Sequence, residues 1–500
     1  MRAVSLGLVA FLLLAAAMIG ATSCGGSNNG SSPGASTGDA GDDGTPSAMG
    51  FGSTTREGGS GACPYGLQCD VPCANGGTSS VSGTVYDPAG LDPLYNVMVF
   101  VAESPLQALD VGVPTGADAC SCPALFKSGS VTTTTTDVDG KFTLKNVPVG
   151  DNVPFVIQVG KWRRQFLIHT VACQDTPFAD KVLTLPSTVP AGDIATSMPQ
   201  IAVSTGSADS LECLMHRIGL PKSEYVAGAG GTGHVHLFAG GQVGGTGAGI
   251  DGSGPGSAET PGMAGAPSSY QNLWDSQAHL MPYDIVLLSC EGGETYNANP
   301  PALEAYLNAG GRVFASHYQY PWLAGPIASK QSYSAPSDWV NALATWTPVG
   351  NGGPNYMAGD VGGDVVTTLS GSSGGFPKGQ ALDQWLGNVG ALGASGVGNT
   401  EVSIFQPRYN AQVTAANKPS QPWIAYDDTS MSPAKRWSMY FSFDTPINPP
   451  RGVGETLPKY CGRAVYSDLH VAGDPKTTDT MSPPGGCADG PLSPQEKVLE

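Results

Sequence analysis

The apolar run at residues 283–290, YDIVLLSC, places the tightest limit on the fold of this chain. A strand that is apolar along its whole length is typical of a parallel sheet covered on both faces. A helical pattern follows at residues 301–309, two glycines end it, and a second apolar strand is expected at residues 312–317. Because parallel strands need a crossover connection, strands that alternate with helices predict a parallel α/β sheet.

The same alternation extends over residues 193–500. Asp209 is expected to cap a helix, because the apolar residues that follow it recur at helical spacing. Residues 326–420 are rich in glycine and are expected to be irregular outside two helices. Further strands are expected at residues 200–206, 234–239, 423–426, 436–443 and 463–470, and further helices at residues 273–280, 338–345 and 380–386.

Residues 78–190 show a different pattern, in which short strand-like segments are separated by turn signals. The sequence Asp137-Val138-Asp139-Gly140, for example, is typical of a hairpin turn. Short strands at this spacing predict a β-sandwich. The predicted fold is therefore multidomain, with a β-sandwich followed by an α/β domain that carries Gly-rich loops. The sandwich strands are expected at residues 81–87, 94–101, 131–136, 141–144, 153–159, 162–171 and 181–185.

The N-terminus carries an apolar run that follows Arg2 and ends at Cys24. This is the arrangement of a secretory signal peptide, and the cysteine at the cleavage position resembles a bacterial lipobox. The resemblance implies that residues 1–23 are removed and that Cys24 carries lipid. A transmembrane anchor is the alternative, but the run is shorter than the roughly 20 residues that a span needs. Residues 24–77 are largely Gly, Ser and Asp, which predicts a flexible tether.

Charge and composition limit the partners of this chain. Its net charge is −18, with 23 Lys and Arg against 41 Asp and Glu. Nucleic-acid binding needs clustered basic residues and is not expected. Contact with a membrane is expected through lipid on Cys24, which places the protein outside the cytoplasm at the bacterial cell envelope, in the periplasm or at the outer membrane. None of the motifs indicates a cofactor.

The chain has 11 cysteines, and ten remain once Cys24 is set aside. In an exported protein this even number predicts up to five disulfides, whose connectivity stays open. A zinc site is the alternative, because Cys69 and Cys73 are closely spaced, as are Cys120 and Cys122. Neither pair has two histidines nearby, which favours disulfides.

Two stretches resemble known families. The pieces VSGTVYD, PLYNVMVFV, TTTDVDGKFTLKNVPVG and FVIQVGK follow, in order, the pattern of carboxypeptidase regulatory-like domains. That resemblance implies a sandwich with an accessory or stalk role, which in some members binds carbohydrate. The pieces YDIVLLS, RVFASH and RAVYSDLH resemble class I glutamine amidotransferase-like domains, closest to the trehalose-utilisation type.

The second resemblance implies a three-layer α/β domain of flavodoxin type over residues 193–500. The helix pattern at residues 493–500 is short, so the natural chain is expected to extend further. In active amidotransferases, a nucleophilic cysteine occupies the turn after the strand that here ends at His317. This chain has no cysteine at that turn and no nucleophile-elbow motif, so the domain is expected to be degenerate. Cys290 lies one strand earlier and is expected to be a disulfide or a buried thiol.

Candidate catalytic residues lie where the predicted parallel strands end, because open α/β sheets build their sites at that edge. His317 and His470 are the main candidates, with Ser316 as a potential nucleophile. Histidines with carboxylates support acid–base chemistry or bind a metal with water. The alternative is that both histidines are hydrogen-bonded structural residues. The carboxylates that could join them are Glu291, Glu294, Asp444 and Asp468.

Two other groups of residues are candidate binding sites. His234 and His236 lie on one face of a strand, an arrangement that suits a metal, although no third ligand is identified. Trp162, Arg163 and Arg164 could stack on a sugar or hold a carboxylate. The alternative for this second group is a strand face that docks the acidic second domain.

The sequence thus supports two hypotheses for function. The first is a lipid-anchored binding or structural protein, with carbohydrate or a cell-surface polymer as a candidate partner. The second is a hydrolase that acts on a glycan or peptide through a His/carboxylate site. The lack of a nucleophile elbow and of a complete triad favours the first hypothesis.

Overall fold

The structure is a computed structural model. Cys24, the predicted signal peptide before it, most of the tether and Cys122 lie outside the described residues. The described residues are 63–120, 123–206, 208–240, 268–295, 298–325, 333–347, 360–369, 374–417, 419–449, 459–470 and 487–500.

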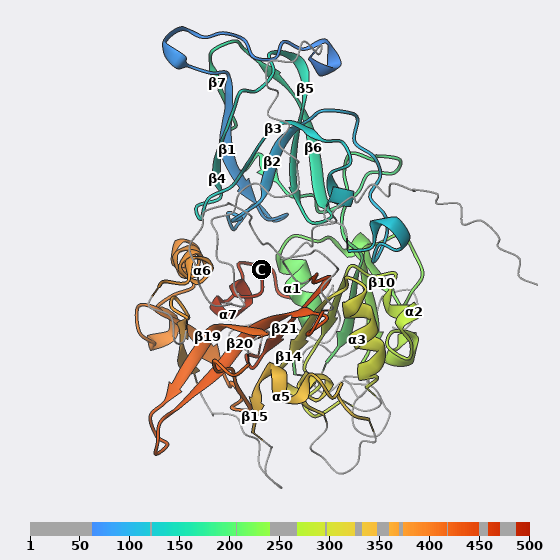
Figure 1. Cartoon of the computed structure of the whole chain (residues 1–500), viewed down its shortest axis with the longest axis vertical. Coiled ribbons are helices and arrows are strands. Elements are labelled where there is room, and N and C mark those ends of the chain that lie inside the picture. The colour runs from blue at the N-terminus through green and yellow to red at the C-terminus, as the bar shows by residue number, and fades with distance from the viewer. Residues whose placement is uncertain are drawn as a thin grey trace, which may run out of the picture.

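Two sheets form the upper body of Figure 1, and they fit the predicted β-sandwich. Their facing sides enclose an apolar core. On β4, Phe142 and Leu144 enter this core while the residues between and beside them face solvent. One sheet contains β1 (Ser80–Tyr86), β4 (Lys141–Lys145), β7 (Asp175–Pro177) and β8 (Leu183–Thr184), and the other contains β2 (Met98–Ala102), β3 (Ser130–Thr135), β5 (Gly150–Val159) and β6 (Trp162–Thr170).

An 11-stranded sheet runs through the lower body, counted over the residues that the structure describes. Its first half is parallel, as the sequence predicts, and its second half is antiparallel. The parallel half has the order β10 (Tyr225–Ala227), β11 (Val235–Ala239), β9 (Ile201–Thr205), β13 (Ile285–Leu288), β14 (Arg312–Ser316) and β21 (Gly462–Ser467), with β12 (Ser268–Ser269) beside β11. The antiparallel half continues with β20 (Lys435–Thr445), β19 (Ser420–Asp428), β16 (Asp360–Val365) and β17 (Glu401–Phe405).

The prediction that residues 326–420 are irregular is wrong for the strands of this antiparallel half. β16 has the sequence DVGGDV, which lacks the apolar pattern of a strand because its centre is Gly362-Gly363. A Cβ atom at Gly363 would lie 2.4 Å from Ile404 Cδ1, so glycine is what allows β17 to pack this closely. A small separate sheet pairs β15 (Thr345–Trp346) with β18 (Ala411–Gln412) in the same region.

Both faces of the parallel half are covered, which accounts for the continuous apolar run in β13. Val286 and Leu288 pack with Leu303 of α3 in one apolar cluster. Leu287 packs with Leu214 of α1 in another cluster, on the opposite face. The helices of the described residues are α1 (Leu211–Arg217), α2 (Gln277–Leu280), α3 (Pro300–Asn308), α4 (Pro321–Ala324), α5 (Val340–Leu343), α6 (Pro377–Asn388) and α7 (Pro494–Lys497).

The sandwich and the lower body are joined by covalent and polar contacts. A disulfide links Cys120, from a loop of the sandwich, to Cys461 just before β21. The backbone N–H of Val113 donates to the carbonyl of Met281 at 2.9 Å. Trp385 of α6 donates through Nε1 to the carbonyl of Pro93 at 2.7 Å. The two bodies are therefore docked at several separate points.

Disulfides account for eight of the described cysteines, in the pairs Cys63–Cys69, Cys73–Cys173, Cys120–Cys461 and Cys213–Cys487. Their presence favours disulfides over the zinc alternative and is compatible with an oxidising, extracytoplasmic compartment. Cys290 is a buried free thiol, one of the two states expected for it. None of the helices within the described ranges has the length and apolar character that a membrane span requires.

Candidate functional site

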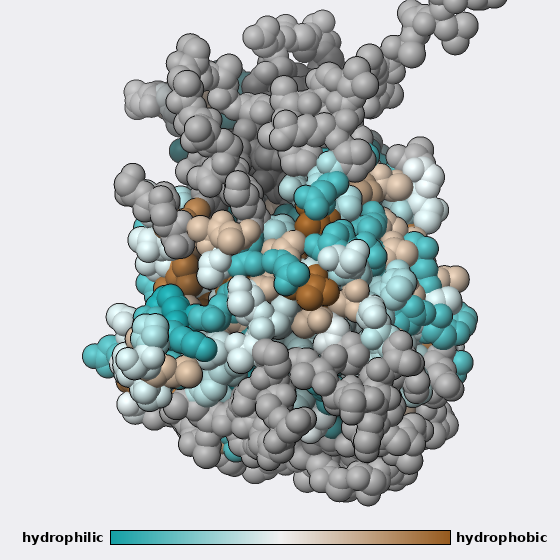
Figure 2. Space-filling model, turned by 60° about the horizontal axis from the view of Figure 1, so that its bottom comes forward, coloured by the Kyte–Doolittle hydropathy of each residue, from teal (hydrophilic) through white to brown (hydrophobic). Residues whose placement is uncertain are grey.

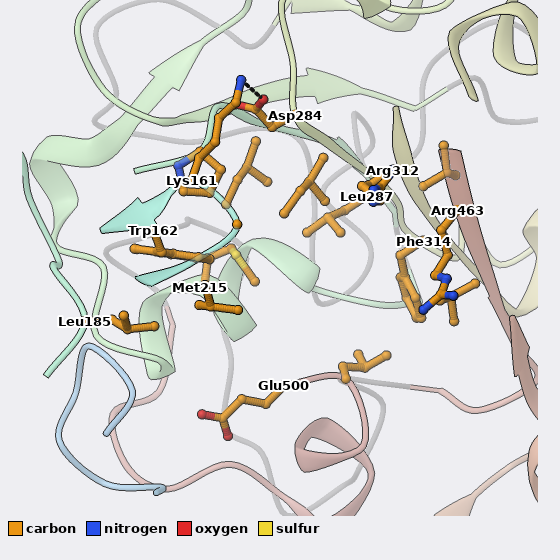
Figure 3. Close-up of a pocket in the computed structure, with 18 of the residues that line it drawn as sticks. Lys161, Trp162, Leu185, Met215, Asp284, Leu287, Arg312, Phe314, Arg463 and Glu500 are labelled. Atoms are coloured by element: carbon orange, nitrogen blue, oxygen red, sulfur yellow. Dashed lines mark ion pairs between the residues drawn. The ribbon is translucent and has the colours of Figure 1, made fainter. Parts of the chain in front are cut away.

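A cavity of about 590 Å³ lies between the sandwich and the lower body (Figure 3). The sandwich contributes Trp162 and Leu185 to its wall, while the sheet contributes Leu287 and Phe314. Helix α1 forms a further wall with the apolar residues Leu211, Leu214, Met215 and Ile218. The helical spacing of these four residues was visible in the sequence, but the surface that faces them was not.

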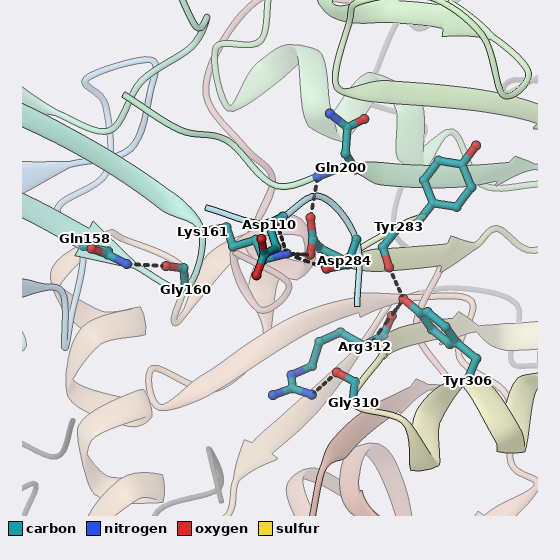
Figure 4. Close-up of polar contacts among 11 residues, drawn as sticks. Asp110, Gln158, Gly160, Lys161, Gln200, Tyr283, Asp284, Tyr306, Gly310 and Arg312 are labelled. Carbon is teal, nitrogen blue, oxygen red and sulfur yellow. Dashed lines mark hydrogen bonds and ion pairs between the residues drawn. The ribbon is translucent and has the colours of Figure 1, made fainter. Parts of the chain in front are cut away.

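The charged groups around the cavity have partners within the protein (Figure 4). Lys161 Nζ lies 2.5 Å from Asp284 Oδ1, and it donates to the carbonyls of Asp110 and Gly112. Burial raises the pKa of Asp284, while Lys161 opposes that rise. Arg312 donates through Nη1 to backbone carbonyls that include Gly310, at 2.9 Å. The cavity therefore presents mainly apolar surface to a ligand.

The predicted binding residues Trp162, Arg163 and Arg164 lie on β6 beside this cavity or behind it. Trp162 lines the cavity, and its Nε1 donates to the carbonyl of Pro186 at 3.0 Å. Arg163 is buried and donates to the carbonyls of Gln107 and Ile194, each at 2.7 Å.

Arg164 donates to Thr184 Oγ1 at 3.1 Å and lies over the ring of Phe166. The contact between Lys161 and Asp284 favours the docking alternative for this strand face. Trp162 remains the member of the predicted group that faces the cavity.

A second cluster lies at the carboxyl ends of neighbouring parallel strands. Cys290, His317 and His470 follow β13, β14 and β21, and their potential ligand atoms all lie within 4.8 Å of one another. Cys290 Sγ and His317 Nδ1 are 3.3 Å apart. The rings of His317 and His470 stack with centroids 3.8 Å apart. The prediction that strand ends bring His317 and His470 together agrees with this geometry.

Asp209 supports this cluster, a role that the sequence did not predict. Its Oδ1 lies 2.9 Å from Nδ1 of His470, and its Oδ2 accepts a hydrogen bond from Ser316 Oγ. The predicted capping role of Asp209 is wrong, because the N-cap of α1 is Ser210. A short polar residue before a helical pattern predicts a cap, and only the neighbouring strand ends give Asp209 these partners.

His317 adopts φ 51° at the turn that leads from β14 into the short 3-10 helix His317–Gln319. Such a left-handed conformation is uncommon for a residue other than glycine and often marks a functional site. Burial, together with the neighbouring His470 and Arg408, lowers the pKa of His317, so its ring is neutral. Burial also raises the pKa of the Cys290 thiol.

Asp468 lies close to the cluster together with Tyr466 and Arg408. Tyr466 donates through its hydroxyl to Asp468 Oδ1 at 2.6 Å, and burial raises the pKa of Asp468 to about 7. Arg408 is fully buried, and its guanidinium lies 4.1 Å from the ring centroid of Tyr318. These residues surround the strand ends with polar groups that are held away from solvent.

The other predicted residues have separate partners. His236 uses both ring nitrogens, with Nδ1 at 2.8 Å from the carbonyl of Gly228 and Nε2 at 2.9 Å from Gln200 Oε1. His234 Nδ1 lies 2.5 Å from Glu224 Oε2. These contacts hold the two histidines apart from the Cys290 cluster. Of the predicted carboxylates, Glu291 accepts from Thr295, Glu294 accepts from Tyr320, and Asp444 pairs with Arg463.

The surface in Figure 2 offers less contrast than the interior does. Apolar residues occur on this face as separate small groups among polar ones, rather than as one continuous patch. Within the described surface of this view, the apolar binding area is therefore internal.

No protein-family model, curated protein or solved structure gives a significant match to the chain.

Proposed function

We propose that this protein is an extracytoplasmic binding protein that holds an apolar small molecule between its sandwich and its α/β body. The cavity of about 590 Å³ carries this proposal. Small-molecule sites typically enclose roughly 300–1,000 Å³, are mostly apolar and often lie between domains. A lipid on Cys24, with the tether of residues 24–77, would hold the binding body near the membrane of the cell envelope.

The partners of the charged groups favour an uncharged, hydrophobic ligand. Lys161 is paired with Asp284, and Arg463 is paired with Asp444 at 2.7 Å. An anionic ligand would have to compete with these carboxylates, whereas an apolar ligand needs only the walls. A carbohydrate partner for the regulatory-like domain stays a prediction, but this cavity has few free polar groups with which to recognise sugar hydroxyls.

The hydrolase hypothesis also stays a prediction, with the His470–Asp209 contact as the observation that favours it. A positioned histidine–carboxylate pair supports acid–base chemistry. The buried position of Cys290 and His317 offers a reacting group no open path among the described residues. Binding is therefore the function that the geometry supports better.

The uncharged fluorescent probe N-phenylnaphthylamine tests the proposed cavity site. We expect saturable binding of one probe per full-length chain. Met215→Trp places a larger side chain in the cavity and is expected to weaken binding about tenfold or more, because each 1.4 kcal/mol of lost contact is a factor of about ten in Kd. Fluorescence titration measures the change.

Met431→Trp is the matched control, because it makes the same substitution at an exposed residue that does not line the cavity. It should leave probe binding unchanged. If the wild-type protein shows no saturable binding, or if both variants bind equally well, the cavity is not the ligand site. Mass spectrometry of organic extracts from the purified protein would then identify the natural ligand class.

A further inference from the structure

We propose that Cys290, His317 and His470 bind a divalent metal ion of the zinc class at the carboxyl ends of β13, β14 and β21. This site is separate from the apolar cavity. The cavity wall includes Ile285 and Arg312, which begin β13 and β14, whereas the proposed ligands follow the other ends of these strands. The proposal therefore does not depend on the proposed binding function.

The distances suit ligands of one ion. In a tetrahedral site, zinc lies about 2.3 Å from sulfur and about 2.0 Å from nitrogen, which separates those two atoms by about 3.5 Å. Cys290 Sγ and His317 Nδ1 lie 3.3 Å apart. Because all three ligand atoms lie within 4.8 Å of one another, small side-chain movements would complete the geometry.

The ligand types favour zinc over calcium or magnesium. Thiolate and imidazole suit late transition metals, whereas calcium and magnesium prefer oxygen ligands. Three protein ligands leave a fourth position for water or another small ligand, which is the arrangement of an accessible rather than a purely structural zinc site. On binding, the Cys290 thiol gives up its proton to solvent and the thiolate bonds to the metal.

Asp209 is the independent observation that points to a metal. A histidine ligand usually bonds through its other nitrogen to a carboxylate, which orients the ring. Nδ1 of His470 lies 2.9 Å from Asp209 Oδ1, so Nε2 is left for the ion. The second oxygen of Asp209 is held by Ser316, which fixes the carboxylate in turn. Asp209 is thus a positioning residue for the proposed site.

Cobalt(II) titration of metal-free, full-length protein tests the proposal, because thiolate coordination to Co²⁺ produces a charge-transfer absorption band. We expect one equivalent of Co²⁺ to bind with this band and an excess of Zn²⁺ to displace it. Cys290→Ser should abolish the band, and His470→Gln should weaken binding. Asp209→Asn should weaken metal affinity by about 10- to 100-fold, as expected for loss of a carboxylate that orients a ligand.

His279→Ala is the matched control, because this exposed histidine on α2 contacts Asp275 and is outside the cluster. It should bind Co²⁺ like the wild type. Circular dichroism of each metal-free variant checks folding. If the wild-type protein shows no stoichiometric thiolate band, or if Cys290→Ser keeps it, the proposal is wrong. N-phenylnaphthylamine binding should be unchanged by the metal, which separates failure of this proposal from failure of the cavity proposal.

Discussion

Glu500 shows how the docking of the two bodies changes the chemistry of one carboxyl group. Lys497, in the same segment, lies 2.8 Å through Nζ from Asp92 Oδ1 of the sandwich. Burial, with the nearby Asp92 and Asp87 carboxylates, raises the pKa of Glu500 to about 9. Glu500 therefore keeps its proton at neutral pH.

The free energy of unfolding should consequently fall as pH rises between about 5 and 9. A carboxyl group whose folded-state pKa exceeds its ordinary value of 4.5 binds more protons in the folded state across that window, so raising the pH favours unfolding. Glu500→Gln should make this dependence shallower in denaturant titrations. Asp151→Asn, at an exposed residue, should leave the slope unchanged. An unchanged slope in Glu500→Gln would contradict the assignment.

At the scale of the element, α7 follows directly from its local sequence. The Ser493-Pro494 start predicts a helix cap with proline at the first helical position. In the structure, Ser493 Oγ accepts from the N–H of Glu496 at 3.3 Å, and Glu496 Oε2 accepts from the N–H of Ser493 at 2.8 Å. This reciprocal capping box begins a segment that Arg217 of α1 holds through an ion pair with Glu496.

Ser493→Ala should destabilise the protein by about 1 kcal/mol, the usual loss for an N-cap hydroxyl. Chemical denaturation measures this difference. Ser334→Ala removes a hydroxyl from an exposed residue outside the helices and should change stability by less than about 0.5 kcal/mol. Equal effects of the two substitutions would show that the capping box contributes no stability.

At the scale of the whole molecule, the Cys120–Cys461 disulfide joins the sandwich to the sheet across a sequence separation of 341 residues. Both cysteines also line the cavity. The bond therefore limits separation of the two bodies at the place where the ligand is proposed to bind.

Replacing Cys120 and Cys461 together by serine should cost about 2–5 kcal/mol, because the unfolded chain regains the freedom of a very long loop. The same change should weaken N-phenylnaphthylamine binding as the cavity walls separate. Removal of Cys63–Cys69, which closes a sequence separation of 6 residues, should cost less and leave the probe affinity unchanged. A larger loss from the shorter loop would contradict this account.

Sequence patterns predicted the elements that have a regular apolar spacing. β13, β14, β20 and α3 lie where that spacing indicates, because a strand or helix that packs in a core must repeat its apolar residues at a fixed period. β16 lacks such a period and was missed. Its Gly363 is explained by close contact with Ile404, a residue of a different strand.

By itself, the sequence determined the β-sandwich pattern, the parallel strands and the positions of His317 and His470 at strand ends. Tertiary structure alone decided that Cys290 and Asp209 join these histidines, and that the sandwich and α1 enclose an apolar cavity. The reason is physical: periodic burial is written into neighbouring residues, whereas these contacts join side chains far apart in the chain. Their partners become known only when the strands are ordered in the sheet and the two bodies are docked.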